Sequence, residues 1–241
     1  MTELVFRDDA YAQSCSATVL EINDRGGIVL DRTVFYPTGG GQPGDSGVLH
    51  VDGGPDIAIA TAVKGVGPDD VVHVPAEGAD VPAVGSAVVA EIDWDRRHRQ
   101  MRIHTGLHLL SAVLPYPVTG GQIGADKGRL DFNIADPSGL DKQQITDQLN
   151  ALVAADHAVA ARWITDAELA AQPELVKTMS VKPPSGAGHV RLIDVDGHDL
   201  QPCGGTHVSR TGEIGSLKVR KIENKGKQNR RVIIVFDPDD T

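Results

Sequence analysis

The chain has 241 residues, of which 40% are hydrophobic and 23% are charged, so it has enough apolar material for one large domain or two smaller ones. Its formal net charge of -10 means that the molecule as a whole repels a polyanion, and any contact with nucleic acid has to come from a local basic patch. No apolar run is long enough to span a membrane, and residues 1–9 lack the basic start and apolar centre of a signal peptide, which indicates a cytoplasmic protein.

Residues 1–93 are predicted to form β structure, because short apolar or alternating stretches recur there between turn-forming clusters. The expected strands are Ser16–Ile22, Gly27–Leu30, Val48–Val51, Ile57–Ala60, Val71–Val74 and Ala87–Ile92. Many short strands at this spacing predict a small barrel or sandwich. The two cysteines of the chain, Cys15 in this half and Cys203 in the other, are expected to be free thiols, although a disulfide is conceivable.

A glycine-rich loop, residues 35–47, interrupts the β half. Gly39, Gly40 and Gly41 are consecutive and are followed by Gln42. Without side-chain bulk the backbone can approach a ligand closely, and a flexible turn is the competing interpretation. The segment lacks the glycine spacing of a dinucleotide site and the ending of a P-loop, so no nucleotide cofactor is expected.

The character of the chain changes near residue 93, where we place a domain boundary. A basic segment leads into a predicted helix, Met101–Leu114, which Pro115 and Pro117 end. The arginines of this segment are candidates to hold phosphates, and a solvated helix start is the competing interpretation. They are Arg96, Arg97, Arg99 and Arg102.

Two pairs of metal-type residues stand out in the second half. His104 and His108 are four residues apart in the predicted helix, so both imidazoles lie on one face and can share a metal ion. Cys203 and His207 have the same spacing around two glycines, which fit a loop better than a helix. Either pair alone is a weak signal. Together they provide three nitrogens and one sulfur, a set that suits one tetrahedral Zn²⁺ per chain.

The rest of the second half predicts an α+β domain with helices packed on an antiparallel sheet. The expected elements are a strand over 130–134, a helix over 139–157 capped by Ser138, a short helix from Asp166, a strand over 189–195 and a hairpin of 214–223 with 230–236.

The last hairpin is the local basic patch that an acidic protein would need to bind a polyanion. Its cations surround a single acid, Glu223. They are Lys218, Arg220, Lys221, Lys225, Lys227, Arg230 and Arg231. The competing interpretation is that lysines on an edge strand prevent aggregation.

Five segments together resemble the editing domain of alanyl-tRNA synthetases, and the chain resembles the free-standing AlaX-type trans-editing relatives of that domain. The segments are Phe35–Gln42, His104–Leu110, Arg129–Phe132, Cys203–His207 and Lys225–Arg231. The editing domain of threonyl-tRNA synthetases shares the metal-type motif, and the glycine-rich barrel is expected to mark the alanyl branch.

The resemblance implies a translation-factor-like β-barrel over 1–93 and a zinc-binding editing domain over 94–241. It also implies hydrolysis of the ester that joins a wrong amino acid, serine or glycine, to the 3′ acceptor end of tRNA(Ala). An alanine pocket excludes neither amino acid well enough, so a second, hydrolytic site is needed.

Roles at single residues follow from the same resemblance. The zinc ion either activates a water molecule or orients the substrate, and Cys203 is the ligand expected to be displaceable. Gln122 matches a glutamine of the family's active-site loop and would orient water or the ester. Thr105 and Thr206 would bind a serine hydroxyl, or else cap backbone groups. The Gly39–Gln42 loop would test the amino-acid side chain.

Three other functions compete with this interpretation. A zinc-stabilised RNA-binding module without catalysis uses the same residues with a closed metal site. A deacylase of another aminoacyl-tRNA uses the same chemistry. A metallopeptidase is disfavoured, because no glutamate follows His104 as it does in a His-Glu-x-x-His motif.

Overall fold

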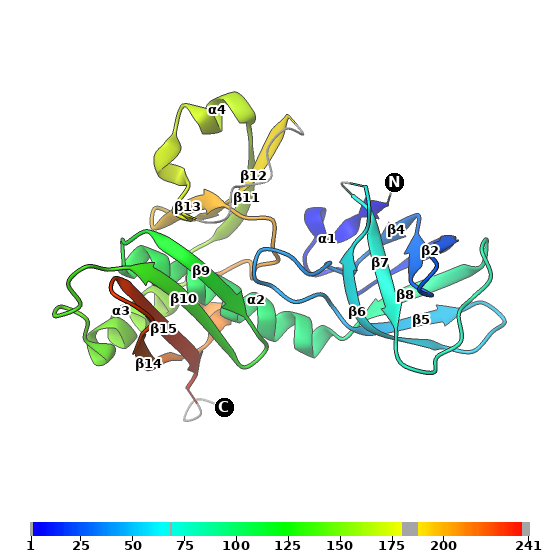
Figure 1. Ribbon diagram of the computed structural model, residues 1–241, viewed down its shortest axis with the longest axis horizontal. Helices are drawn as coiled ribbons and strands as arrows, with labels where there is room; N and C mark the ends of the chain where they lie inside the picture. Colours follow the sequence, from blue (N-terminus) through cyan, green and yellow to red (C-terminus); the bar gives the residue numbers. More distant parts are fainter. Residues whose placement is uncertain (1, 68, 180–187, 238–241) are drawn as a thin grey trace. The chain divides into compact units, whose positions relative to one another are not determined.

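The computed structural model describes residues 2–67, 69–179 and 188–237. The chain divides into two compact units, Met1–His98 and Arg99–Thr241, and the division falls within the long helix α2 (Trp94–Val113) (Figure 1). No helix of the described residues is both long enough and apolar enough to cross a membrane. A boundary between separate domains near residue 93 stays a prediction.

The first unit is built around a closed barrel with the strand order β2-β3-β7-β6-β5-β8, and all neighbouring strands are antiparallel. The strands are β2 (Ser14–Ile22), β3 (Ile28–Leu30), β5 (Gly47–Val51), β6 (Ile57–Lys64), β7 (Val71–Pro75) and β8 (Ala87–Ile92). Two short strands, β1 (Glu3–Leu4) and β4 (Arg32–Thr33), pair in parallel, and a four-residue helix, α1 (Val5–Asp8), follows β1. The predicted barrel and its six strands are confirmed.

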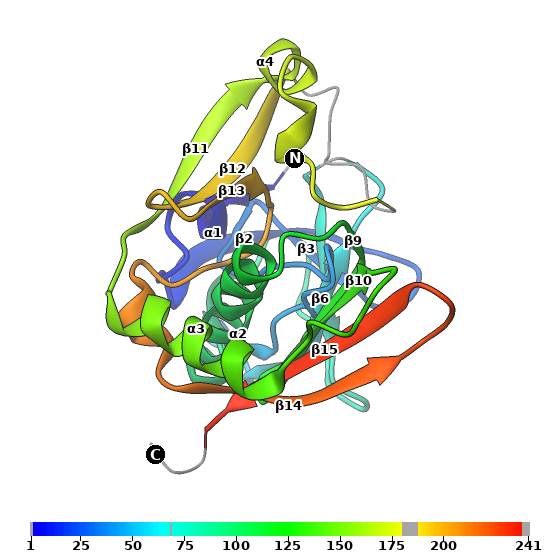
Figure 2. The ribbon, with the colours of Figure 1, turned by 90° about the vertical axis from the view of Figure 1, so that its left-hand side faces the viewer.

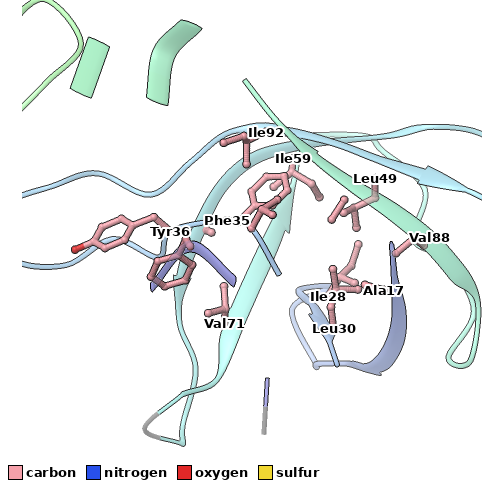
Figure 3. Close-up of a cluster of buried hydrophobic side chains, with 14 of the residues drawn as sticks. Ala17, Ile28, Leu30, Phe35, Tyr36, Leu49, Ile59, Val71, Val88 and Ile92 are labelled. Carbon is pink, nitrogen blue, oxygen red and sulfur yellow. The ribbon is translucent and has the colours of Figure 1, made fainter. Parts of the chain in front are cut away.

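The barrel core follows from the alternation of each strand. Every second residue of β8 is buried, and Leu30 and Leu49 have no exposed surface. Figure 3 shows Phe35 among these aliphatic side chains. Each such side chain stabilises the fold by about 1.5–3 kcal/mol, so the barrel needs no metal or disulfide to hold its shape.

The second unit contains two antiparallel sheets. A four-stranded sheet has the order β14-β15-β10-β9, and a three-stranded sheet has the order β11-β12-β13. The strands are β9 (Val118–Ile123), β10 (Lys127–Asn133), β11 (Val159–Thr165), β12 (His189–Val195), β13 (Asp199–Pro202), β14 (Leu217–Asn224) and β15 (Asn229–Phe236). The predicted α+β class and the last hairpin are confirmed.

Helices α2 and α3 (Lys142–Ala154) lie beside the four-stranded sheet (Figure 2). At Gly106 a Cβ atom would lie 2.8 Å from Leu217 Cδ1, so any other residue there would require the Leu217 side chain to shift. Asn150 of α3 bonds the backbone of Leu217 through both amide atoms, at 2.8 and 2.9 Å. The short elements α4 (Asp166–Ala170), η1 (Pro173–Leu175) and η2 (Thr211–Ile214) complete the unit.

Two helix starts differ from the prediction. Helix α2 begins at Trp94 instead of Met101, because the Asp93 carboxylate accepts a hydrogen bond from the Arg96 backbone N–H at 3.1 Å and caps the helix there. Helix α3 begins at Lys142, since the cap is Asp141 and not Ser138. Strands β1, β4, β9, β11 and β13 were not predicted.

Candidate metal and active site

Four side chains of the second unit converge on one point. The potential ligand atoms of His104, His108, Cys203 and His207 all lie within 4.8 Å of one another, and they form the one such cluster among the described residues. The Cys203 Sγ atom lies 3.5 Å from His104 Nε2 and 3.3 Å from His207 Nε2. The three histidines are buried and Cys203 is half-buried. Both cysteines of the chain are free, as predicted.

The spacing of these atoms fits a metal ion. In a tetrahedral site with Zn–S near 2.3 Å and Zn–N near 2.05 Å, sulfur and nitrogen are separated by about 3.6 Å. The two measured S···N distances, 3.5 and 3.3 Å, are close to this value. Three imidazoles and a thiolate are ligands for Zn²⁺ and not for the oxygen-preferring Mg²⁺ or Ca²⁺. The cluster can therefore hold a metal ion, and its donor set favours zinc.

A helix and a fixed loop supply the two pairs of ligands. His104 and His108 lie one turn apart on α2. Cys203 follows β13 directly, and its backbone N–H donates to the Arg191 carbonyl at 3.1 Å. The Arg191 guanidinium in turn donates to the carbonyls of Cys203 at 3.0 Å and Gly205 at 2.9 Å. These three hydrogen bonds to Arg191 of β12 hold the backbone of the Gly-Gly loop at Cys203 and Gly205.

Thr105 determines which nitrogen of His207 faces the cluster. The Thr105 hydroxyl donates to the Met101 carbonyl at 3.0 Å, so it has to accept from His207 Nδ1–H, which lies at 3.1 Å. It also accepts from the Val208 backbone N–H at 3.3 Å. Because Nδ1 carries the proton, the lone pair of Nε2 is free for a metal ion.

Asp199 has the same role for His108. Its carboxylate accepts from His108 Nδ1 at 2.8 Å, from Gln201 Nε2 at 2.7 Å and from Lys177 Nζ at 2.5 Å. Burial alone would raise the pKa of the Asp199 carboxyl, but the His108 hydrogen bond and the Lys177 ammonium group lower it to about 2. Gln201 also donates to the Ser111 hydroxyl at 3.1 Å, which anchors the network on α2.

The electrostatics of the cluster favour metal binding at Cys203 and His207 and oppose it at His108. Burial would raise the pKa of the Cys203 thiol, but the neighbouring His104 and His207 hold this pKa well below its ordinary value, which favours the thiolate form. Burial and the charge of His104 lower the pKa of His207 well below its ordinary value. Burial would lower the pKa of His108, whereas Asp199 and Cys203 raise it to about 9, so metal binding displaces a proton there.

Asp199, Gln201, Lys177 and Ser111 were missed by the sequence analysis. One signal was present in the sequence: Asp199, Gln201 and Cys203 are spaced by two residues, so they point to the same face of a strand. Gln100 was also missed. It is fully buried one turn before His104, and neither atom of its side-chain amide has a hydrogen-bond partner among the described residues.

The predicted substrate residues lie in several places. Thr206 is buried within the Gly-Gly loop segment. Gln122 is exposed on β9 and accepts a bond from Arg129 Nε at 3.3 Å. The segment Gly39–Gln42 is a tight turn whose end residues exchange backbone hydrogen bonds of 3.0 and 2.9 Å. Gly40 and Gly41 have φ of 57° and 84°, which other residues rarely adopt.

The predicted phosphate-binding arginines of α2 require a correction. Arg97 has no exposed surface, and its guanidinium binds the Asp45 carboxylate and the carbonyls of Val34 and Ala10. The burial of this guanidinium and its partners within the protein argue against a phosphate contact at Arg97. Arg96 donates to the Gly44 carbonyl at 2.9 Å. Arg99 forms an ion pair with Asp126. Arg102 donates to the Ile214 carbonyl and lies over the Phe236 ring.

The cations of the last hairpin fall into three groups. Arg230 is buried and donates to Asn224 Oδ1 and the Gly226 carbonyl, so it holds the tip of the hairpin and is not available to phosphates. Others share acids: Lys221 and Lys225 pair with Glu223, Arg231 and Arg129 pair with Asp131, and Lys218 pairs with Asp237. Arg220 and Lys227 are exposed. The hairpin therefore has cations on its surface, but fewer than the sequence suggested.

Residues 190–233, which include Cys203 and His207, match the family described as "Threonyl and Alanyl tRNA synthetase second additional domain". Residues 9–96 match the family described as "tRNA synthetases class II (A)". The fold and the metal-type cluster thus define a protein of the class that carries this additional domain.

Three relatives specify the class further. The alanyl-tRNA editing protein AlaX-M of Methanosarcina mazei is 35% identical over 244 residues, which cover 96% of this chain and 95% of the relative. AlaX-M of Saccharolobus solfataricus is 32% identical over 99% of this chain and 100% of the relative. Alanine–tRNA ligase of Pyrobaculum calidifontis is 38% identical over 98% of this chain, but only 27% of the ligase. The chain belongs to the AlaX-M family of alanyl-tRNA editing proteins, which confirms the resemblance.

Proposed function

We propose that this protein hydrolyses mischarged tRNA(Ala) in trans, with serine as the main wrong amino acid and glycine as a second. The observation that carries the proposal is the cluster of His104, His108, Cys203 and His207, with two imidazoles oriented by Thr105 and Asp199. The relatives that align over their full length are named alanyl-tRNA editing proteins. The bond cleaved would be the ester between the amino acid and the 3′ acceptor end.

The four side chains would hold one Zn²⁺ ion. When bound there, zinc supplies Lewis acidity toward an ester carbonyl or a water molecule. Cys203 is the one half-buried ligand, so solvent and substrate would approach the cluster from its side. Asp199 would keep the ring of His108 fixed while the proton on its other nitrogen is displaced.

Several residues would contact the aminoacyl group. Gln122 is exposed and would orient the water or the ester. Thr206 precedes His207 directly and would meet a serine hydroxyl. The Thr105 hydroxyl already donates to Met101 and accepts from His207 and Val208, so it would have to give up one of these bonds to take the same role. The rigid turn at Gly39–Gln42 would test the amino-acid side chain through its backbone groups. Such contacts are needed because serine and glycine differ from alanine by one hydroxyl or one methyl group.

The exposed cations of the hairpin would hold tRNA phosphates. Arg220 and Lys227 are candidates, and Lys221, Lys225 and Arg231 remain at the surface although they pair with acids. A polyanion can replace Glu223 as the partner of Lys221 and Lys225 at little cost, because exposed ion pairs contribute only ~0–1 kcal/mol, whereas Asp131, the partner of Arg231, is buried. Binding should weaken steeply with salt, as counterion release requires.

The test is deacylation of Ser-tRNA(Ala), Gly-tRNA(Ala), Ala-tRNA(Ala) and one unrelated charged tRNA by the wild type and by Cys203→Ala. Zinc content and circular dichroism would be measured on both proteins. We expect rapid loss of serine with alanine spared, and a folded mutant with little activity. Turnover of the unrelated tRNA with sparing of Ser-tRNA(Ala) would assign the same chemistry to another substrate.

A four-ligand cluster without an obvious open position favours one alternative, a zinc-stabilised RNA-binding module without catalysis. In that case no charged tRNA would be turned over, although zinc is bound. Cys203→Ala would then lose its fold together with its metal, because binding energy at a closed site is folding energy. The circular dichroism of the mutant separates the two functions.

A further inference from the structure

One large aromatic side chain of the second unit is exposed without an evident structural reason. Trp163 lies in β11, the edge strand of the three-stranded sheet, and 51% of its surface is exposed. Its neighbours along the strand are Ala161, Arg162 and Ile164. A tryptophan is the largest apolar side chain, and exposing half of it forgoes hydrophobic stabilisation that a core position would provide.

The strand register places Trp163 in line with the metal-type cluster. Trp163 pairs with Arg191 on β12. On the other side of β12, Leu192 pairs with Pro202 of β13. One residue further along, Arg191 lies opposite Cys203, whose N–H donates to the Arg191 carbonyl at 3.1 Å. Trp163, Arg191 and Cys203 thus form a row across three strands. With about 4.8 Å between neighbouring strands, the backbones of Trp163 and Cys203 are about 10 Å apart.

The face of the sheet can also be assigned. Residues that pair directly across strands share a face, so Trp163 is on the side of Arg191, whose guanidinium holds the carbonyls of Cys203 and Gly205. The other face packs on α4 and η1 through a small apolar cluster. That cluster contains Leu169, Val190, Leu192, Ile164, Leu175, Val176 and Leu200. Trp163 is therefore on the face that carries the metal-type cluster, and not on the face that packs on α4 and η1.

We propose that Trp163 is a stacking platform for a nucleobase at the 3′ end of the RNA substrate. The inference rests on the proposed function and deepens it. The scissile ester is attached to the ribose of the terminal nucleotide, so the terminal base lies one sugar away from the carbonyl at the cluster. An indole two strands from Cys203 is at a suitable distance to meet that base, and stacking on an aromatic ring is how proteins hold single-stranded ends.

The surroundings of Trp163 favour a base over a protein partner. Protein interfaces need a contiguous apolar patch, whereas the exposed residues next to Trp163 are the small Ala161 and the charged Arg162. Arg191 lies beside the indole in the register and is fixed by two carbonyls, so this strip of the sheet is rigid. A rigid ring next to a guanidinium suits an RNA end.

Stacking makes a specific kinetic prediction. Every base has a π face, and the amino acid is not part of the stack, so Trp163 contributes equally to serine and glycine substrates. We expect Trp163→Ala to lower kcat/KM on both charged tRNAs by the same factor, about 5- to 150-fold, the equivalent of ~1–3 kcal/mol. Trp163→Phe should keep most of the activity. Arg162→Ala, one residue away on the opposite face, is the matched control and should change little.

Binding can be tested without any chemistry. The chain has two tryptophans, so Trp94→Phe leaves Trp163 as the single tryptophan, whose emission can be excited selectively over that of the three tyrosines. This protein would be titrated with an uncharged acceptor-stem hairpin of tRNA(Ala) and with the same hairpin lacking its 3′-terminal nucleotide. Quenching by the complete hairpin that is largely lost with the shortened one would support the proposal. Because neither RNA carries an amino acid, this result is independent of whether the protein deacylates Ser-tRNA(Ala).

Three results would overturn the proposal. Equal quenching by both hairpins would mean that Trp163 does not meet the terminal base. A loss of zinc or of thermal stability in Trp163→Ala that accounts for its activity would assign the residue a structural role. A change in sedimentation of Trp163→Ala with unchanged RNA binding would show that the indole lies in a contact between two copies of the chain.

Discussion

The carboxylate of Asp199 offers the sharpest test of how the metal-type cluster is held together. We expect Asp199→Asn to lower the affinity for Zn²⁺ by about 10- to 100-fold, or ~1.4–2.7 kcal/mol, the usual effect of losing the hydrogen-bond partner of a ligating histidine. In the wild type one carboxylate oxygen faces His108 and Gln201 and the other faces Lys177, at 2.8, 2.7 and 2.5 Å. An asparagine has one oxygen, so its NH₂ group has to face either the His108 N–H or the Lys177 ammonium group.

The assay is a competition between the metal-free protein and a chromophoric chelator, read at fixed pH. Lys177→Met is the control, because it leaves Asp199 with His108 and Gln201 and should have a smaller effect. Circular dichroism of both metal-free variants would show that the fold is retained. An unchanged zinc affinity of Asp199→Asn in a folded protein would refute the reasoning, since the orientation of His108 would then not depend on the carboxylate.

Three further predictions concern stability. Gln100→Met should raise the free energy of unfolding in urea by about 1–3 kcal/mol, because a buried amide without a partner is removed, and an unchanged midpoint would contradict this. Burial lowers the pKa of His73 from 6.5 to about 4, so roughly 3 kcal/mol of folding stability is present above pH 6.5 and is lost as the pH falls toward 4. His73→Asn should therefore make the free energy of unfolding depend less on pH in this range. Parallel curves of unfolding free energy against pH for the two proteins would argue against this. Arg97→Met should cost about 3–5 kcal/mol because the buried Asp45 is left unpaired, whereas Arg220→Ala should leave thermal unfolding within ~0.5 kcal/mol and weaken tRNA binding at low salt.

The sequence was informative where a local pattern determines the structure. Alternation located the barrel strands, and the spacing of His104 and His108 placed both on one face of a helix. The pairing of that helix with Cys203 and His207 could be proposed because the ligand chemistry is restrictive. These features depend on neighbours within one strand or one turn.

Features that depend on distant parts of the chain were not predictable in this way. A basic run such as residues 96–102 normally indicates a solvated surface, but Arg97 is buried because Asp45, which is 52 residues earlier, neutralises it. Strand β11 has four consecutive exposed residues, so it shows no alternation. Asp199 could be recognised as a partner of His108 only when β13 was seen to lie against α2.

The hydrogen bonds around the four ligands have a consequence for how a metal ion is gained and lost. Thr105 and Asp199 hold His207 and His108, Arg191 holds the loop at Cys203, and none of these contacts involves a metal. These hydrogen bonds orient the ligands from within the protein, so the second unit should stay folded when a bound ion is removed. Under the proposed zinc-dependent deacylation, chelation should abolish the activity without unfolding the protein, and added zinc should restore the activity at once.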